Sequence, residues 1–164
     1  MTPRPMHRQD RQLPQEEAWA LLTQGTYGVL SVVGDEGWPY AVPMHYTVMD
    51  GQIYLHCAKT GYKLDAIARD DRVCFTVTLR EELVQDHATS LYESVVVLGR
   101  AALVTDQATH QAALAHLVDA LGRVSPDLRD QYIARRGQNT AVLVIRPVHL
   151  TGKAKRDFRP IQQR

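Results

Sequence analysis

The chain has 164 residues, of which 23% are charged, and a formal net charge of +1. This length predicts one domain with its own hydrophobic core, and the near balance of charges argues against the broad basic surface of a nucleic-acid-binding protein and against an acidic solvating tail. No apolar run approaches the ~20 residues that cross a membrane, so we expect neither nucleic acid nor a membrane as a partner.

The N-terminal residues and the cysteines favour a cytoplasmic location. The first twenty residues contain prolines and several charges, where a signal peptide needs an unbroken apolar segment. Only two cysteines occur, Cys57 and Cys74. Both lie in apolar, strand-like runs, which is not the pattern of a secreted disulfide framework. We therefore expect a protein of the reducing cytoplasm.

Three parts are expected along the chain. Residues 1–14 are polar and contain proline, which indicates a loosely held N-terminal arm. Residues 15–155 carry the regular patterns of a single folded domain. Residues 156–164 are expected to form a short C-terminal tail.

The folded part begins with a short amphipathic helix after Pro14, with acidic residues in its first turn and Gly25 as its stop. Runs rich in Val, Tyr, Phe and Ile, separated by turn residues, then predict strands. The six predicted strands are residues 26–33, 40–49, 52–58, 72–79, 92–104 and 140–150.

Helical patterns fill two of the gaps between these strands. One short helix is expected at residues 61–69, before the fourth strand, and a longer one at residues 106–122. Another is expected at residues 125–136, where Ser125 is suited to be the N-cap and Pro126 to be the first helical residue.

Six antiparallel strands with few helices predict a mainly β fold, a barrel with peripheral helices, because closure removes the unpaired edges of a sheet. Gly99, inside the fifth strand, predicts a bulge or a close backbone approach. Residues 94–104 are apolar on both faces, as though one face lined the barrel and the other met a second subunit. We therefore expect a homodimer.

A lysine in the first turn of the expected helix 61–69 lies at the positive end of the helix dipole, which is unfavourable for a cation. With Thr60 as N-cap, the free N–H groups of Gly61, Tyr62 and Lys63 would point outward. A phosphate bound there would accept these donors and pair with Lys63, with Lys59 in support. The alternative is that Lys63 is an ordinary solvated lysine.

His56 ends the preceding strand and shares a face with Tyr54 and Ala58, close to the expected phosphate site. It could bond a cofactor phosphate, donate a proton or hold a small anion, or it could simply bond backbone at the end of a strand. Cys57 points to the opposite face, where a buried, inert thiol is expected. The histidines and cysteines are otherwise scattered, so we expect no metal site.

A mid-strand proline in the run "VPMHY" points to an edge or a bulge, because Pro43 removes one donor from the ladder. Backbone amides and carbonyls along such an edge suit the rim of a flat heteroaromatic ring, and His45 and Tyr46 could add polar contacts. The alternative is a bulged edge strand without a ligand.

Residues 27–77, followed by "YESVVVLGRAALV" at residues 92–104, resemble the pyridoxamine 5′-phosphate oxidase-like, FMN-binding split-barrel superfamily. Within it they are most similar to the nitroimidazole-resistance (Nim) flavoproteins. The match runs in order from about residue 8 to about residue 153, where "HLTGK" is similar to the family's C-terminal strand. The resemblance implies a split β-barrel homodimer with two FMN sites at its interface.

The resemblance also implies roles for particular residues. Lys63 falls on the lysine that holds the FMN phosphate, His56 on the active-site histidine of Nim-type proteins, and Ser94 on a further contact across the dimer. The implied cofactor contacts are Pro43, Met44, His45, Tyr46, His56, Cys57, Ala58, Gly61, Tyr62, Lys63 and Ser94.

Two positions depart from the family pattern. Many relatives carry histidine where this chain has Tyr62, and arginine where it has Glu93. The basic phosphate ligands of the oxidase itself are also fewer here, so we do not expect pyridoxamine phosphate as the substrate.

The expected function is an FMN-dependent oxidoreductase that passes electrons from NAD(P)H to a nitroaromatic or similar small flat acceptor, with His56 as proton donor or ligand clamp. No dinucleotide-binding fingerprint occurs, so NAD(P)H is expected to bind only transiently. One alternative is a non-catalytic protein that sequesters flavin or haem, with His45, His56 or His149 as the haem ligand. Another is a deazaflavin-dependent relative.

Overall fold

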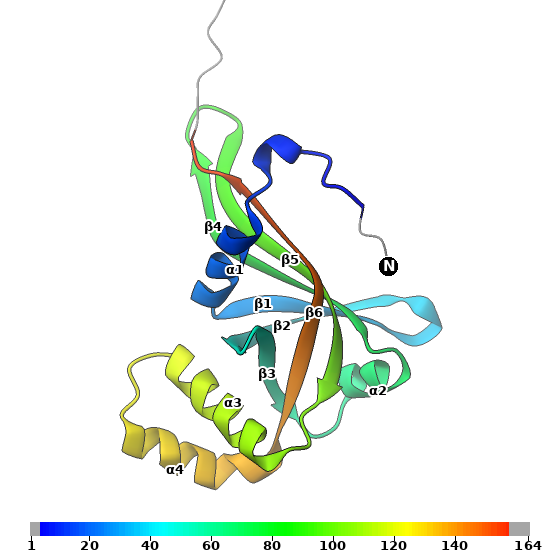
Figure 1. The fold of residues 1–164 in the computed structure, drawn as a ribbon, viewed down its shortest axis with the longest axis vertical. Coiled ribbons are helices and arrows are strands. Elements are labelled where there is room, and N and C mark those ends of the chain that lie inside the picture. The colour runs from blue at the N-terminus through cyan, green and yellow to red at the C-terminus, as the bar shows by residue number, and fades with distance from the viewer. Residues whose placement is uncertain (1–3, 158–164) are drawn as a thin grey trace, which may run out of the picture.

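The computed structural model describes residues 4–157 and shows six strands and four α-helices in that part of the chain (Figure 1). The strands are β1 (Tyr27–Val33), β2 (Pro39–Met49), β3 (Gln52–Ala58), β4 (Arg72–Val84), β5 (Thr89–Leu103) and β6 (Thr140–Lys155). The helices are α1 (Gln15–Gln24), α2 (Tyr62–Arg69), α3 (Gln107–Ala120) and α4 (Pro126–Arg136), with a 3-10 turn, η3 (Gly137–Asn139), after α4. Residues 1–3 of the expected arm and 158–164 of the expected tail lie outside the described residues.

The strands form a closed antiparallel barrel in the order β1-β2-β3-β6-β5-β4, which confirms the predicted architecture. The pairing of β5 with β6 shifts register between Leu98 and Gly99. A Cβ atom at Gly99 would lie 2.7 Å from Cγ2 of Ile145, so only glycine allows the two strands to approach this closely. The bulge predicted at Gly99 is confirmed.

Side chains alternate between the barrel interior and its outer surface, as the period of a β-strand requires. In β1, Leu30 and Val32 are buried while Val29 and Val33 point outward and are partly exposed. Buried apolar side chains from all six strands and from α1 and α2 fill the main core. The alternation therefore fixes which residues of each strand can face a ligand outside the barrel.

The α3–α4 helical hairpin connects β5 to β6 and covers one outer side of the barrel (Figure 1). Helix α3 buries Ala113, Leu114 and Leu117 in a second apolar cluster with residues of β3 and β6. Helix α4 begins as predicted, because Ser125 Oγ accepts a hydrogen bond from the N–H of Leu128 and proline follows it. Within residues 4–157, none of the helices has the length and apolar character needed to cross a lipid bilayer.

Strands β4 and β5 continue past the barrel as a long hairpin that stands upright in Figure 1. Their pairing reaches Val84 and Thr89, whereas the two predicted strands ended at residue 79 and began at residue 92. The N-terminal arm is also held more firmly than expected. The N–H of Leu13 donates to the carbonyl of Gly152 at 3.0 Å, and Gln12 forms a bridge with Lys153 of β6.

Candidate functional site

A cleft opens where β2 and β3 separate. Residues 39–45 of β2 pair only with β1, and the pairing of β2 with β3 begins at Tyr46 and Leu55. Beyond Leu55, residues 56–58 of β3 pair only with β6. The two strand segments therefore diverge and border a hollow of about 580 Å³. Its lining residues are Tyr27, Val42, Pro43, Met44, His45, His56, Cys57, Ala58, Lys63, Asn139 and Thr140.

Pro43 lies on the open edge of β2. It is paired with Val29 of β1 and has no partner in β3. The prediction that a mid-strand proline marks an edge is confirmed. Backbone polar groups on the cleft side of residues 42–45 lack a strand partner, so this edge can hydrogen-bond a ligand.

Helix α2 reaches the cleft through Lys63, whereas Gly61 and Tyr62 at the start of the helix are not among the lining residues. The helix also begins differently from the prediction. Gly61, not Thr60, is the N-cap, and no side chain caps the helix. Gly61 has φ 134° and ψ 164°, a conformation that residues with a Cβ atom adopt only at a cost. The N–H groups of the first turn consequently face outward without a side-chain acceptor, as an anion site requires.

Lys63, in the first turn of α2, is half-buried and lines the cleft. Among the ion pairs of the described residues, none involves Lys63. Its ammonium group is close enough to Cys57 to oppose the pKa rise of that thiol. The cleft therefore contains a cation without a carboxylate partner, beside open helix N–H groups.

Tyr62 takes part in the packing of α2 against the β1–β2 turn. Its hydroxyl accepts a hydrogen bond of 2.6 Å from the N–H of Asp35, and its ring packs edge-on against Tyr40 with centroids 4.8 Å apart. The side chain of Tyr62 does not line the cleft, so only its backbone N–H is suited to bind a ligand there.

Two histidines face the cleft from opposite sides. His45 lies on β2, where its Nδ1 is 3.1 Å from the carbonyl oxygen of Thr26 and its ring contacts Tyr27 edge-on. His56, on β3, keeps an exposed edge. Partial burial lowers the pKa of His56, and the nearby His45 lowers it further. At neutral pH His56 is therefore an uncharged imidazole that can donate or accept a hydrogen bond.

Cys57 and Ala58 complete the β3 side of the cleft. Cys57 is a free, half-buried thiol, and burial raises its pKa, with Lys63 opposing that rise. The thiol therefore stays protonated at neutral pH, which agrees with the expectation that it is inert.

Two residues predicted to contact a cofactor turn their side chains into the barrel. Tyr46 is fully buried and donates a hydrogen bond of 2.6 Å to the carbonyl of Leu22, and burial raises its pKa. Met44 is 8% exposed and belongs to the core, although it borders the cleft. The expectation that the Tyr46 side chain adds a polar contact to the ligand is wrong for this reason.

Ser94 lies away from the cleft within the chain. It belongs to β5, between Thr78 of β4 and Lys153 of β6. A contact of Ser94 with a ligand in this cleft would have to come from a second copy of the chain.

Sequence reasoning missed Asn139 and Thr140, which line the cleft at the start of β6. They reach it because Thr140 pairs with Ala58 across β3 and β6. These two positions are about 80 residues apart in sequence, and no local pattern signals such a pairing.

A six-stranded antiparallel barrel with strands that separate around a cleft belongs to the class of split β-barrels. The sequence profile of the pyridoxamine 5′-phosphate oxidase family matches residues 14–154. The chain therefore belongs to this family, and the resemblance seen in the sequence is confirmed. A search of curated proteins found no significant match.

Several solved structures share the fold. A protein from Bacteroides thetaiotaomicron assigned to 5-nitroimidazole antibiotic resistance is 23% identical, with a TM-score of 0.73 and coverage of 87% of this chain and 86% of that chain. An FAD-binding protein from Mesorhizobium loti is 23% identical, with a TM-score of 0.65 and coverage of 88% and 97%. The flavocytochrome Anf3 of Azotobacter vinelandii is 22% identical, with a TM-score of 0.77 and coverage of 97% and 75%. At these identities the likeness shows the fold alone.

Proposed function

We propose that the protein is an FMN-dependent oxidoreductase that reduces nitroaromatic or similar small flat acceptors with electrons from NAD(P)H. The observation that carries the proposal is the composition of the cleft. One end of the cleft has the uncapped N-terminus of α2 with an unpaired lysine, and the other end has the open edge of β2. Membership of the pyridoxamine 5′-phosphate oxidase family and the flavin-binding proteins among its structural neighbours support the same cofactor class.

The phosphate end of FMN fits the start of α2. A Cβ atom built on Gly61 would meet nothing within 4 Å, so space is open directly in front of the helix N-terminus. A phosphate there would accept hydrogen bonds from the N–H groups of Tyr62 and Lys63 and pair with the ammonium group of Lys63. The dipole of α2 would add to the attraction.

The ring end fits the open edge of β2. Pro43, Met44 and His45 would present backbone groups to the polar rim of the isoalloxazine, in place of the missing β3 partner. Cys57 and Ala58 would face the ligand from β3. His45, anchored at Thr26, would hold its ring in place beside the cofactor.

Bound FMN would supply two-electron redox chemistry. For a nitro acceptor the balance is ArNO2 + NAD(P)H + H+ → ArNO + NAD(P)+ + H2O. His56 is suited to hold the acceptor by a hydrogen bond from its ring N–H, because its exposed edge faces the cleft. Its neutral ring can also relay a proton to a nitro oxygen, taking up a proton from solvent at one ring nitrogen and giving one up from the other.

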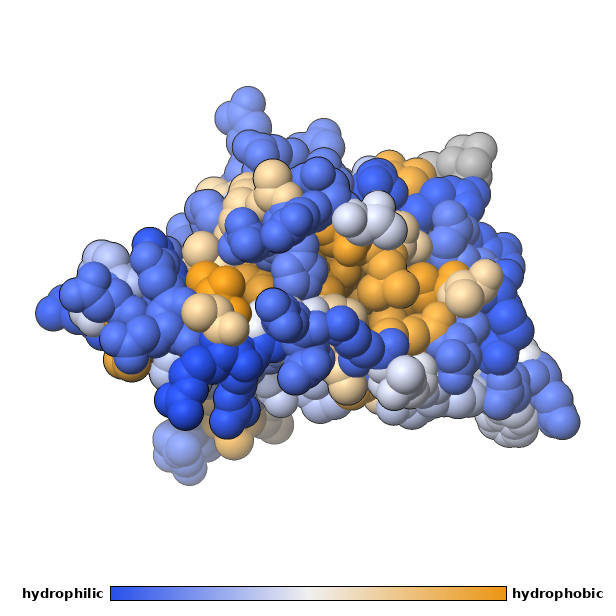
Figure 2. Space-filling view, turned by 90° about the horizontal axis from the view of Figure 1, so that it is seen from below, coloured by the Kyte–Doolittle hydropathy of each residue, from blue (hydrophilic) through white to orange (hydrophobic). Residues whose placement is uncertain are grey.

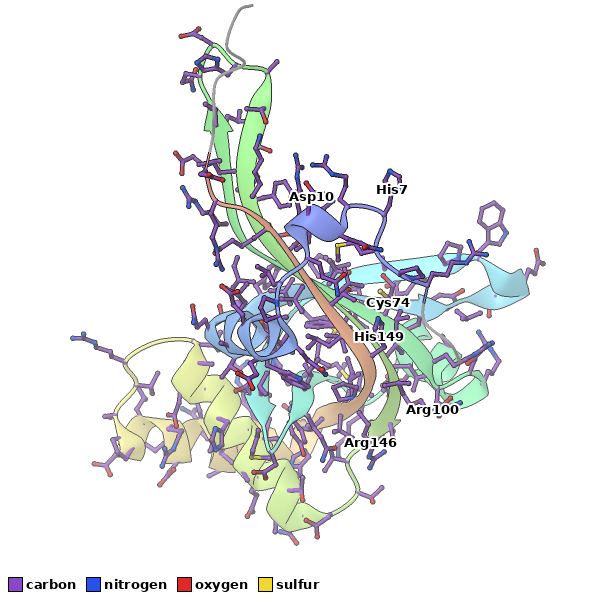
Figure 3. All side chains as sticks on the ribbon, turned by 45° about the horizontal axis from the view of Figure 1, so that its top comes forward. His7, Asp10, Cys74, Arg100, Arg146 and His149 are labelled. Atoms are coloured by element: carbon purple, nitrogen blue, oxygen red, sulfur yellow. The ribbon has the colours of Figure 1, made fainter. Side chains whose placement is uncertain are left out.

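We also propose a homodimer formed through the outer face of the barrel. Register places two rows of side chains without aspartate, glutamate, lysine or arginine across five strands of this face. The rows are Ala41–Ser31–Cys74–Leu98–His149 and Pro43–Val29–Thr76–Val96–Thr151. In Figure 3, Cys74 and His149 lie near each other on this face, with Arg100 and Arg146 toward its border. Two such rows, partly exposed and without aspartate, glutamate, lysine or arginine, are suited to a second copy.

A second copy on this face would explain a role for Ser94, because Ser94 lies two residues before Val96 and therefore on the same outer side of β5. Sedimentation equilibrium tests the dimer. Val96→Arg should convert a dimeric protein to a monomer, and a parent protein that sediments as a monomer contradicts this part of the proposal.

Purified protein tests the function itself. We expect flavin absorbance at ~450 nm, release of FMN on denaturation as identified by mass spectrometry, and NAD(P)H oxidation that depends on an added nitroaromatic compound. A Soret band without flavin would favour the haem-binding alternative. Bound flavin with no acceptor-dependent oxidation of NAD(P)H would favour a sequestering protein.

A further inference from the structure

Helices α3 and α4 border a small apolar cavity on the outside of the barrel that is partly open to solvent. It measures about 180 Å³, and its apolar walls are Leu114, Leu117, Val118, Leu121, Tyr132 and Ile133. From the end of the molecule that carries the two helices, apolar residues are seen to gather in the middle of the surface between hydrophilic ones (Figure 2). The helical hairpin therefore leaves a hollow that its own side chains do not fill.

This cavity adjoins the cleft between β2 and β3. His56 and Thr140 line both hollows, so the imidazole of His56 stands at the boundary between them. A molecule in the cavity would therefore lie beside His56 and be directed toward the cleft. None of the six apolar wall residues lines the cleft itself, so the cavity is a separate compartment.

The size of the cavity restricts its occupant. Drug-sized ligands occupy pockets of about 300–1,000 Å³, whereas an apolar cavity of about 150 Å³ holds one benzene molecule. At about 180 Å³, this cavity fits one aromatic ring with small substituents.

The charge at the cavity is positive. Among the described residues that line it, Arg136, in the last turn of α4, is the one lysine or arginine, and none is an aspartate or glutamate. No ion pair among residues 4–157 involves Arg136. By contrast, Arg129 on the same helix pairs with Asp119 and Asp130. Arg136 is exposed to solvent, so its guanidinium is accessible to a carboxylate on a ring that packs in the apolar hollow beside it.

From this combination we infer that the cavity between α3 and α4 is the acceptor pocket, and that the acceptor is a one-ring aromatic acid. Its ring packs between the two helices, its carboxylate pairs with Arg136, and its reducible group points past His56 toward the cleft. That the bound molecule is reduced rests on the proposed function. Its binding in the cavity does not depend on flavin.

Isothermal titration calorimetry with 4-nitrobenzoate tests the inference on the purified protein, and 4-nitrobenzamide is the neutral probe of the same shape. We expect 4-nitrobenzoate to bind about five-fold more tightly than the amide, the scale of one partly exposed charge pair. Arg136→Gln should remove this preference. Arg135→Gln is the matched control, because Arg135 is the adjacent exposed arginine and does not line the cavity.

A second variant tests the cavity as a space. Val118→Trp fills it from a half-buried position on α3, and we expect it to abolish binding of both probes. Val148→Trp adds the same ring at a position on β6 that is 59% exposed, and it should bind both probes like the parent. Flavin absorbance is recorded for every variant, so that a loss of cofactor is distinguished from a loss of probe binding.

The outcomes separate the two proposals. Probe binding that disappears in Val118→Trp and loses its charge preference in Arg136→Gln supports the acceptor pocket, even in a preparation without flavin. Equal binding by Val118→Trp and the parent overturns it, as does a parent protein that binds neither probe at millimolar concentration. A parent protein that binds the probes in the cavity but takes up no FMN overturns the proposed function instead.

Discussion

The hydroxyl of Tyr46 donates a hydrogen bond of 2.6 Å to the backbone carbonyl of Leu22, and this bond joins β2 to the end of α1 inside the barrel. The ring of Tyr46 also packs edge-on against Phe75 with centroids 5.0 Å apart. Tyr46 is the first residue of β2 that pairs with β3. The same residue therefore anchors the point where the cleft begins, although its own side chain is turned away from it.

Tyr46→Phe should destabilise the fold without affecting ligand binding. The substitution leaves the buried carbonyl of Leu22 without its donor, which costs about 1–3 kcal/mol of unfolding free energy. Chemical denaturation measures the loss, and the FMN dissociation constant should equal that of the parent. Tyr132→Phe, at a side chain that is 53% exposed, is the control and should change stability by less than about 0.5 kcal/mol. Weaker FMN binding by a stably folded Tyr46→Phe protein would show that the Tyr46 hydroxyl contributes to the ligand site after all.

Gly61→Ala tests the conformation at the start of α2. With φ at 134° an alanine is strained even though its methyl group would meet no neighbour, so we expect a loss of about 1–3 kcal/mol in unfolding free energy. FMN binding should weaken as well, because the first turn moves. Gly137→Ala is the control, since its φ of −57° and ψ of −38° are helical. Parent-like stability and FMN affinity in Gly61→Ala would show that this turn tolerates a side chain and is not built for a close ligand.

Lys63→Ala should weaken FMN binding by about 1.5–3 kcal/mol, the scale of a charge-assisted hydrogen bond. Fluorescence titration of the apoprotein with FMN measures it. Lys59→Ala is the comparator, because Lys59 lines the hollow beside α3 and not the cleft, and its effect should be smaller. An unchanged dissociation constant in Lys63→Ala would show that this lysine does not bind the FMN phosphate.

The pKa of His56 predicts a pH dependence of stability. Partial burial, and to a smaller extent the nearby His45, lower this pKa below its ordinary value of 6.5. Near pH 6 His56 is therefore protonated more often in the unfolded chain than in the folded chain. The unfolded state then holds more protons, and the unfolding free energy falls as the pH falls through this range. The parent should lose more stability than His56→Gln between about pH 7.5 and about pH 5.

Denaturant melts of the two proteins at each pH measure this difference. His116→Gln, at an exposed position on α3, controls for the removal of a histidine elsewhere. Equal losses in the parent and in His56→Gln would mean that His56 titrates alike in the folded and unfolded chains.

The barrel was predictable from the sequence because its signals are local. Alternation of apolar residues, turn residues between the runs, and the Ser125–Pro126 start of α4 each act over a few positions. The predicted ends of the fourth and fifth strands, at residues 79 and 92, were wrong for a related reason. The polar residues beyond them lack the apolar pattern of a strand, yet β4 and β5 continue to pair there through backbone bonds, which do not depend on side-chain type.

The site was predictable only in part. Of the predicted residues 43–46, the first three line the same cleft as His56 and Lys63, because strand-end and helix-start signals place them there, whereas the side chain of Tyr46 is buried. Alternation puts residues 44 and 46 on one face of β2 and residues 43 and 45 on the other, but which face is inside depends on the neighbouring strands. The sequence pattern therefore assigned Tyr46 to the ligand side. The contribution of Thr140 depends on a pairing between β3 and β6 that no local pattern contains.

The central claim is that the cleft between β2 and β3 holds FMN with its phosphate at the start of α2. A crystal structure of the protein grown with excess FMN tests it most directly. The account predicts electron density for the phosphate at the N–H groups of Tyr62 and Lys63, and for the ring along residues 42–45. An empty cleft, or FMN bound at another place with Lys63 exposed to solvent, would contradict it.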